Sequence, residues 1–317
     1  MNEKLAFTSL EAIYSINGCL DAPYQTSFLI HKLVKDNNGK PADITVSVKI
    51  EQLQKRKITV LSEPTACWPI FVDYLYKTER LLMIFDGQFL HLDNICFSCQ
   101  DEHNQRDIEI VKDRILSERL QYFTTDTGIT NVNAKLGNVQ DVITDDLFAR
   151  WQQLLEELGN IHQMYLYSIY KSGMPIDIRA AFMVEMTEPV LELLQDKNMI
   201  GKGKYPYLID KLRVVVDCYG KDIFSDEMKN WDDDFLQSAV NTRVNIMHIK
   251  RNQRTQAFDG KQCAAFMKKF SLMYRVILLD LLGVERSRYY ERVISITGAI
   301  NTWMREHGTC LIGMDEK

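Results

Sequence analysis

A short stretch near position 245 combines residue types that could cut RNA. Arg243 and His248 stand five positions apart in it. A histidine accepts or delivers a proton near neutral pH, and a planar arginine stabilises the extra charge of a phosphorane transition state through paired hydrogen bonds. An RNA 2′-hydroxyl that loses its proton can attack the neighbouring phosphate, so this pair predicts cleavage of RNA, and not of DNA, without a metal ion.

The same stretch carries side chains suited to holding a sugar-phosphate strand. Asparagine amides both donate and accept hydrogen bonds, and lysine and arginine add positive charge. We therefore predict RNA contacts from Asn241, Asn245, Lys250, Arg251 and Asn252. The proposed chemistry calls for no metal ligand and no cofactor.

These residues are predicted to lie on one helix over residues 232–252, which the acidic run 232–234 would open favourably. On this helix, four polar residues are expected within a sector of about 60°, and four apolar residues form an adjoining strip. The sector holds Asn241, Asn245, His248 and Asn252, and the strip holds Leu236, Val240, Val244 and Met247. Arg243 lies at the far edge of the strip, about 140° from His248, so one helix does not bring the two together. The alternative is an ordinary surface histidine and a structural arginine, because this spacing also arises by chance.

Composition limits the class of protein. The chain has 317 residues, 46% of them hydrophobic, and a net charge of −5. An acidic chain does not adhere broadly to nucleic acid, although a narrow basic cleft can still hold a strand. No apolar run long enough to span a membrane and no signal core are seen. Seven cysteines without a framework spacing favour reduced thiols in the cytoplasm.

Two kinds of periodicity divide the chain. Short β-branched runs predict strands over 25–34, 43–50 and 57–61, and Asp86-Gly87 predicts the turn of a β-hairpin over 81–95. A helix over 107–123 and an aperiodic stretch over 124–140 follow. Helical periodicity then predicts helices over 144–170, 175–195 with a kink at Pro189, 206–219, 261–282 and 286–307. The fold class is therefore α+β, with a β-rich domain over 1–140 and an all-helical bundle over 141–317.

The helical half, roughly 145–317, resembles the HEPN superfamily, whose hallmark is Arg-x4–6-His. The N-terminal part resembles the domain that precedes Apea-like HEPN modules in bacterial defence proteins, through ERLLMIFDGQFLHLDNICFS and LSERLQYF. Carried over to this chain, Arg243 matches the motif arginine and His248 the motif histidine. Val244 stands where many members have a polar residue, and Lys250 where members paired with a nucleotidyltransferase have tyrosine.

This resemblance implies a metal-independent endoribonuclease that acts as a toxin in antiviral, abortive-infection defence. It also implies a homodimer in which two Arg-His pairs line one composite site. The β-rich domain would then sense an infection signal, such as a phage-derived trigger, or restrain the nuclease. The alternative is a non-catalytic HEPN module that serves as an RNA- or protein-binding adaptor. A transcriptional regulator is less favoured, because no basic recognition helix is evident.

Three further signals have a plainer interpretation. Cys96-Phe97-Ser98-Cys99 is a lone CxxC without a second pair at zinc-ligand spacing. Gly201-Lys202-Gly203-Lys204 lacks the pattern of a P-loop and is interpreted as a basic loop, with an RNA-phosphate contact as the alternative. The aromatic residues Trp151, Tyr165, Tyr167 and Tyr170 are expected in the core rather than on a stacking surface.

Overall fold

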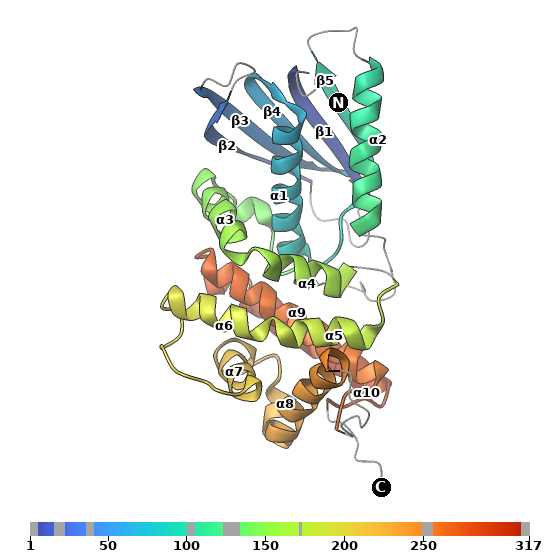
Figure 1. Ribbon diagram of the computed structural model, residues 1–317, viewed down its shortest axis with the longest axis vertical. Helices are drawn as coiled ribbons and strands as arrows, with labels where there is room; N and C mark the ends of the chain where they lie inside the picture. The colour runs from blue at the N-terminus through green and yellow to red at the C-terminus, as the bar shows by residue number, and fades with distance from the viewer. Residues whose placement is uncertain are drawn as a thin grey trace. The chain divides into compact units, whose positions relative to one another are not determined.

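The computed structural model describes residues 6–15, 23–35, 41–99, 105–122, 134–170, 173–248 and 256–311. The described residues form two compact units, one up to position 153 and the other from position 154 onward. The N-terminal unit is built on an antiparallel sheet, and the C-terminal unit is helical, so the α+β class predicted from the sequence is confirmed (Figure 1).

The sheet of the first unit has five strands among the described residues, in the order β2-β3-β4-β1-β5. Its strands are β1 (Ala6–Ser15), β2 (Tyr24–Lys35), β3 (Pro41–Gln52), β4 (Arg56–Cys67) and β5 (His91–Cys99). The strands predicted over 25–34, 43–50 and 57–61 correspond to β2, β3 and β4, and each is longer than predicted. Helices α1 (Trp68–Asp86) and α2 (Gln105–Tyr122) belong to the same unit.

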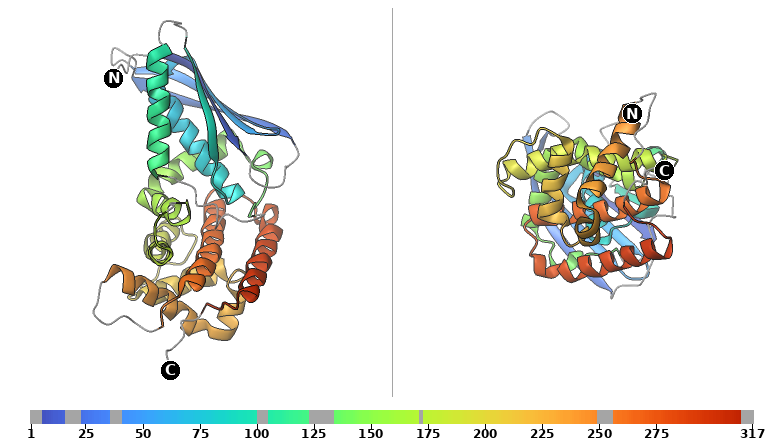
Figure 2. Two further views of the ribbon diagram at one scale, coloured as in Figure 1. Left: turned by 90° about the vertical axis from the view of Figure 1, so that its right-hand side faces the viewer. Right: turned by 90° about the horizontal axis from the view of Figure 1, so that it is seen from below.

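Alternation along the strands makes one face of the sheet its core. In β3 every second residue from Ile44 to Ile50 is buried, as expected for a strand with one face covered. Leu10, Ala12 and Tyr14 of β1 are buried in the same alternating manner. Helix α1 packs on β4 and β1 (Figure 2), and its apolar side chains Phe71, Leu75 and Leu82 are buried.

The hairpin predicted around Asp86-Gly87 is wrong, because residues 68–86 form helix α1. Gly87 ends this helix with φ 66, and its N–H bonds to the Met83 carbonyl at 2.9 Å. Glycine suits a left-handed helix end as well as a hairpin turn. The preceding run Leu81–Phe85 is apolar without a break, and such a run does not distinguish a strand from a buried helix.

Helix α3 (Asp145–Leu158) begins as predicted, with the Thr144 hydroxyl accepting a hydrogen bond from the Leu147 N–H at 3.1 Å. Its first half packs with the sheet unit. Phe148 stacks on Phe28 with ring centroids 4.2 Å apart, and the Trp151 indole donates to the Lys77 carbonyl at 2.8 Å. These contacts put the division between the compact units inside α3, whereas composition suggested 140/141.

The second unit continues from the end of α3 and consists of helices. They are α4 (Asn160–Tyr170), α5 (Ile176–Glu185), α6 (Thr187–Asp196), α7 (Leu208–Val215), the π-helix η3 (Val216–Gly220), α8 (Ser225–Met247), α9 (Gly260–Leu281), the short turn η4 (Arg286–Arg288) and α10 (Tyr290–Glu306). Two helices predicted as continuous are broken, at Gly159 and at Met186. Pro189 lies in the first turn of α6, where its missing N–H costs no helical bond.

Helix α9 forms the centre of this unit. It contacts α4, α5, η3 and α10, and α10 runs beside it (Figure 2). Apolar residues along one side of α9 are buried, including Phe266, Phe270 and Leu278. Its start is fixed by a capping box, in which Asp259 accepts from the Gln262 backbone and the Gln262 side chain accepts from the Asp259 backbone.

Helix α8 begins at Ser225, seven residues earlier than predicted, so the acidic run 232–234 lies inside the helix and does not cap it. Asp226 and Glu227 occupy its first turn instead, where negative charge is favourable. Glu227 also pairs with Lys269 of α9 at 2.6 Å, with both side chains buried. Burial lowers the pKa of Lys269, while Glu227 acts against that shift. This pair fixes the start of α8 against α9.

Candidate active site around Arg243 and His248

Helix α8 ends immediately before the predicted catalytic histidine. Its last residue is Met247, and His248 leaves the helix with φ −117 and ψ 86. The helix predicted to run to residue 252 is therefore too long, and the expected grouping of His248 with three asparagines on one helical face is wrong. No glycine or proline marks this end in the sequence, so the local pattern did not reveal it.

The end of the helix brings Arg243 and His248 together within one chain. The Arg243 guanidinium Nη1 lies 3.0 Å from the imidazole Nε2 of His248. The expectation that the two side chains diverge by about 140° assumed a continuing helix. Because His248 turns out of that helix, the two side chains meet without a second copy of the protein.

Glu185, at the end of α5, is a third member of this cluster that the sequence did not predict. Its carboxylate Oε2 accepts a hydrogen bond from the Arg243 Nε at 2.5 Å. Helices α5 and α8 pack against each other, and the small buried residues Ala180 and Ala181 of α5 let its neighbours approach closely. Glu185 is 58 positions from Arg243, so nothing in the local sequence connects the two.

The direction of the hydrogen bond assigns a role to the Nε2 atom of His248. An arginine can only donate, so Nε2 accepts from Arg243 in this contact. Nε2 therefore carries the lone pair that a general base needs, and His248 is exposed to solvent. The Arg243 side chain is 21% exposed, and that of Glu185 39%. The three groups are thus open to a substrate from outside the unit.

The sequence predicted that Asn241 contacts RNA, but its side chain is buried. It is 4% exposed, its Oδ1 accepts from Gln237 at 2.9 Å, and its Nδ2 donates to the Gln256 carbonyl at 3.4 Å. Its neighbour Thr242 accepts from the Phe258 N–H at 2.8 Å and donates to the Ser238 carbonyl at 2.9 Å. Asn241 and Thr242 therefore hold residues 256–258 against α8.

Of the other predicted RNA contacts, only Asn245 is among the residues that the structure describes. Asn245 is partly exposed on the last turns of α8. Lys250, Arg251 and Asn252 lie outside the described residues. Of the apolar strip, Leu236 is fully buried, whereas Val240, Val244 and Met247 are partly exposed.

Trp151, Tyr165 and Tyr170 are buried, as predicted, and Tyr167 is partly exposed. The carbonyls of Gly201 and Gly203 each accept from the Gln195 side chain at 3.3 Å, which shapes the basic loop. Cys96 and Cys99 lie on strand β5. Within the described ranges, no group of three or more His, Cys, Asp or Glu side chains could hold a metal ion. No helix in those ranges is long and apolar enough to cross a membrane.

Comparison with known proteins bears on the helical unit. This α+β chain carries an Arg-His pair at the end of a bundle helix. Residues 186–288 match the family described as Apea-like HEPN, which supports a HEPN superfamily protein, as the sequence predicted. The match contains both Arg243 and His248, while Glu185 lies one residue before it. No curated protein and no solved structure matches the chain.

The match to this family gives a coarse statement of function. A HEPN domain indicates an RNase-type or nucleotide-related function, and HEPN domains are commonly RNases. RNA binding is consistent with such a domain. The cluster of Arg243, His248 and Glu185 is the part of the unit whose chemistry fits that class.

Proposed function

We propose that this protein is a metal-independent endoribonuclease whose catalytic pair is Arg243 and His248. The observation that carries the proposal is the 3.0 Å approach of the Arg243 guanidinium to His248 Nε2 on an exposed end of α8. A phosphate-binding cation and a proton acceptor in contact are what cleavage by a 2′-hydroxyl requires. The match to Apea-like HEPN supports the assignment.

The chemistry would proceed by attack of the 2′-hydroxyl on the adjacent phosphorus. His248 Nε2 takes the hydroxyl proton, the new P–O2′ bond forms, and the P–O5′ bond breaks. The leaving 5′ oxygen takes up a proton and becomes a hydroxyl. Arg243 donates to the non-bridging phosphate oxygens, where negative charge increases in the transition state.

In the unbound protein Arg243 donates to the same nitrogen that must accept the proton. A phosphate would compete for Nη1, and moving this donor to the phosphate would free the Nε2 lone pair. Glu185 would keep hold of Nε during that exchange, since it contacts the opposite edge of the guanidinium. Glu185 is therefore proposed as a positioning residue.

A homodimer with a composite site is proposed from the superfamily resemblance. The contact within one chain removes the geometric reason for a dimer, but one imidazole cannot accept and donate a proton at the same moment. A second copy would supply the acid that protonates the 5′ oxygen. The partly exposed Val240, Val244 and Met247 could contribute to a two-fold, isologous contact.

The biological setting is proposed from the same resemblance. The nuclease would act in the cytoplasm as the toxin of an abortive-infection system. The β-rich unit would respond to a phage-derived trigger. Asn245, Lys250, Arg251 and Asn252 would add contacts to the RNA strand near the catalytic pair.

The test is incubation of the purified full chain with total RNA in EDTA. We expect cleavage by the wild type and none by His248→Ala. His307→Ala is a matched control, since His307 is an exposed histidine at the end of α10, and it should cleave like the wild type. Equal activity in all three proteins would reject the assignment. Binding of RNA without cleavage by any of them would support a non-catalytic HEPN adaptor instead.

A further inference from the structure

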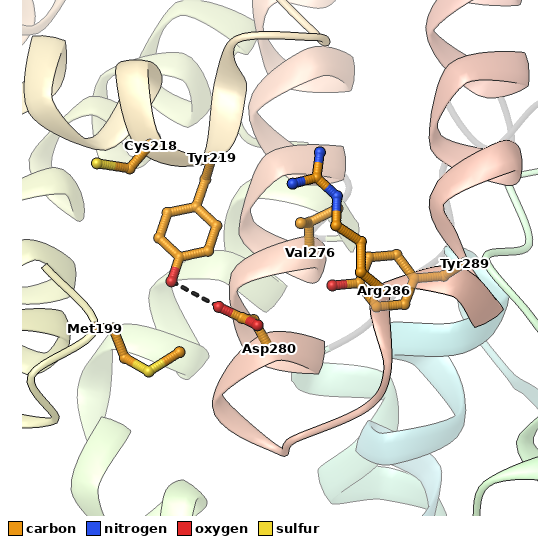
Figure 3. A pocket seen from close by; sticks show the side chains of 7 residues that line it. All are labelled: Met199, Cys218, Tyr219, Val276, Asp280, Arg286 and Tyr289. Atoms are coloured by element: carbon orange, nitrogen blue, oxygen red, sulfur yellow. Dashed lines mark hydrogen bonds between the residues drawn. The ribbon is translucent and has the colours of Figure 1, made fainter.

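A pocket of about 200 Å³ lies in the helical unit, between the π-helix η3, helix α9 and the turn η4 (Figure 3). It lies at the opposite end of α8 from the Arg-His pair. The π-helix ends at Gly220, one turn before α8 begins, whereas Arg243 is near the other end of this 23-residue helix. At 1.5 Å per residue, α8 is about 34 Å long, so the pocket is separate from the catalytic cluster.

The π-helix η3 contributes Cys218 and Tyr219 to the lining of the pocket. Such helices are rare and often occur at functional sites. Gly220 allows the close approach of η3 to α9, because a Cβ there would lie 2.9 Å from the Met273 sulfur. The preceding Tyr219 reaches across to α9, and its hydroxyl donates to Asp280 at 2.8 Å. The carboxylate has two oxygens and further lone pairs that can accept from a ligand.

Tyr289 supplies a second polar group inside the pocket. The residue is 3% exposed and lines the pocket. Figure 3 shows its hydroxyl pointing into the pocket, toward the side that holds Val276. A tyrosine hydroxyl in this position can donate a hydrogen bond to an acceptor atom of a ligand. Burial, followed by the charge of Asp280, raises the pKa of Tyr289 to about 12, so the hydroxyl remains a donor at neutral pH.

The mouth of the pocket carries a positive group, Arg286, whereas the Asp280 carboxylate lies inside. The Arg286 side chain is 66% exposed and pairs with Asp222 at 3.0 Å. A ligand would thus meet a carboxylate acceptor and a hydroxyl donor inside and a guanidinium outside. The volume is below the roughly 300–1,000 Å³ of pockets that enclose drug-sized ligands. It suits one fused ring system, with the rest of the ligand remaining at the mouth.

We propose that this pocket binds the base of a guanine nucleotide, with its phosphate at Arg286. Guanine presents two adjacent donors, N1–H and the 2-amino group, which match the Asp280 carboxylate, and next to them the O6 acceptor, which matches the Tyr289 hydroxyl. Adenine places the acceptor N1 where the carboxylate lies, so the same geometry rejects it. The Arg286 guanidinium exchanges its exposed pairing with Asp222 for the phosphate.

The test is calorimetric titration of the full chain with GMP, AMP and guanosine. We expect GMP to bind at least ten times more tightly than AMP. Asp280→Asn should weaken GMP binding at least tenfold, and Tyr289→Phe several-fold. Glu285→Gln, which makes the same charge change on a neighbouring residue that does not line the pocket, should bind like the wild type. Arg286→Ala should weaken GMP but leave guanosine unchanged.

A second measurement needs no substitution. Cys218 is exposed and lines the pocket, and Cys96 is an exposed cysteine on strand β5. GMP, and not AMP, should slow maleimide labelling of Cys218 while leaving that of Cys96 unchanged. Equal binding of GMP and AMP, absence of GMP binding at millimolar concentration, or binding of guanine only within RNA would overturn the proposal. His248→Ala should still bind GMP, so failure of the nuclease assignment and failure of this site are distinguishable.

Discussion

The Arg243 guanidinium binds two side chains at once, the Glu185 carboxylate and the His248 imidazole. Its Nε donates to Glu185 and its Nη1 donates to His248, so the planar group lies between the two. A lysine ammonium carries the same charge but is a single point with no fixed fork. These contacts therefore predict that RNA cleavage requires the planar shape of arginine at position 243 as well as its positive charge.

Arg243→Lys tests that requirement. The three donors of a lysine ammonium share one nitrogen. They therefore cannot contact Glu185, His248 and a phosphate from separate positions, as the guanidinium can. We expect the RNA cleavage rate to fall by about 10²–10³-fold, the usual effect of losing a preorganised donor to a developing charge. The measurement is the initial rate on a fluorogenic RNA, with the melting temperature as a check on folding. A rate near that of the wild type would mean that a point charge suffices.

Glu185→Gln tests the positioning role of the acid. The amide keeps the size of the side chain but removes the charge, and a hydrogen bond to a charged group contributes about 1.5–3 kcal/mol. We expect kcat to fall by about tenfold, which corresponds to about 1.4 kcal/mol. Glu188→Gln on α6 is the control, since Glu188 pairs with Lys211 away from Arg243. Equal rates for both variants and the wild type would leave Glu185 without a role.

The sequence predicted Arg243 and His248 from their chemistry and spacing, but not their contact. That contact depends on where α8 ends, and the end is set by bonds to residues 256–258 rather than by a local signal. Glu185 was not predictable, because it comes from another helix. Asn241 was predicted to contact RNA because an amide can form hydrogen bonds to a sugar-phosphate strand. The structure buries this amide, which donates to the Gln256 carbonyl instead.

At the scale of elements, the bond between Thr242 Oγ1 and the Phe258 N–H holds Phe258 against α8. Both partners are buried, so the bond has no competition from water. Removing one partner leaves a buried donor unsatisfied, which costs about 1–3 kcal/mol. The position of His248 at the helix end depends on this tether.

Thr242→Val removes the hydroxyl and preserves the shape. We expect the melting temperature to fall by about 2–4 °C for each kcal/mol lost, and cleavage to fall with it. Thr297→Val is a matched control on α10. The Thr297 hydroxyl is buried without a partner in the described residues, so replacing it by a methyl group should be neutral or stabilising. Equal melting temperatures for the two variants would contradict the tether.

Elements with strict periodicity were the predictable ones. In strand β3 buried residues alternate with partly exposed ones, and α9 has a continuous buried stripe with a capping box. The end of helix α1 was predicted as one strand of a hairpin, because its apolar run follows neither the period of a helix nor that of a strand. Glycine at position 87 serves either structure, so only packing against the sheet decides between them.

At the scale of the whole molecule, the proposed homodimer would place the Arg-His pairs of both copies at one phosphate. The arginine of one copy could then act with the histidine of the other, while the second histidine, the proposed acid, adds to the rate. Subunit exchange between inactive Arg243→Ala and inactive His248→Ala proteins gives a heterodimer with one intact arginine and one intact histidine. We expect partial recovery of RNA cleavage. A dimer that exchanges subunits without any recovery would show that each chain uses only its own pair.

The central claim is that His248 Nε2 removes a 2′-hydroxyl proton while Arg243 stabilises the phosphate. The ends of the RNA fragments test it most directly, because attack by the 2′-hydroxyl leaves a characteristic chemical record. Products made by the wild type in EDTA should carry a 2′,3′-cyclic phosphate or a 3′-phosphate, with a 5′-hydroxyl on the other fragment. Fragments with 5′-phosphate ends, or cleavage that requires an added divalent metal, would contradict the claim.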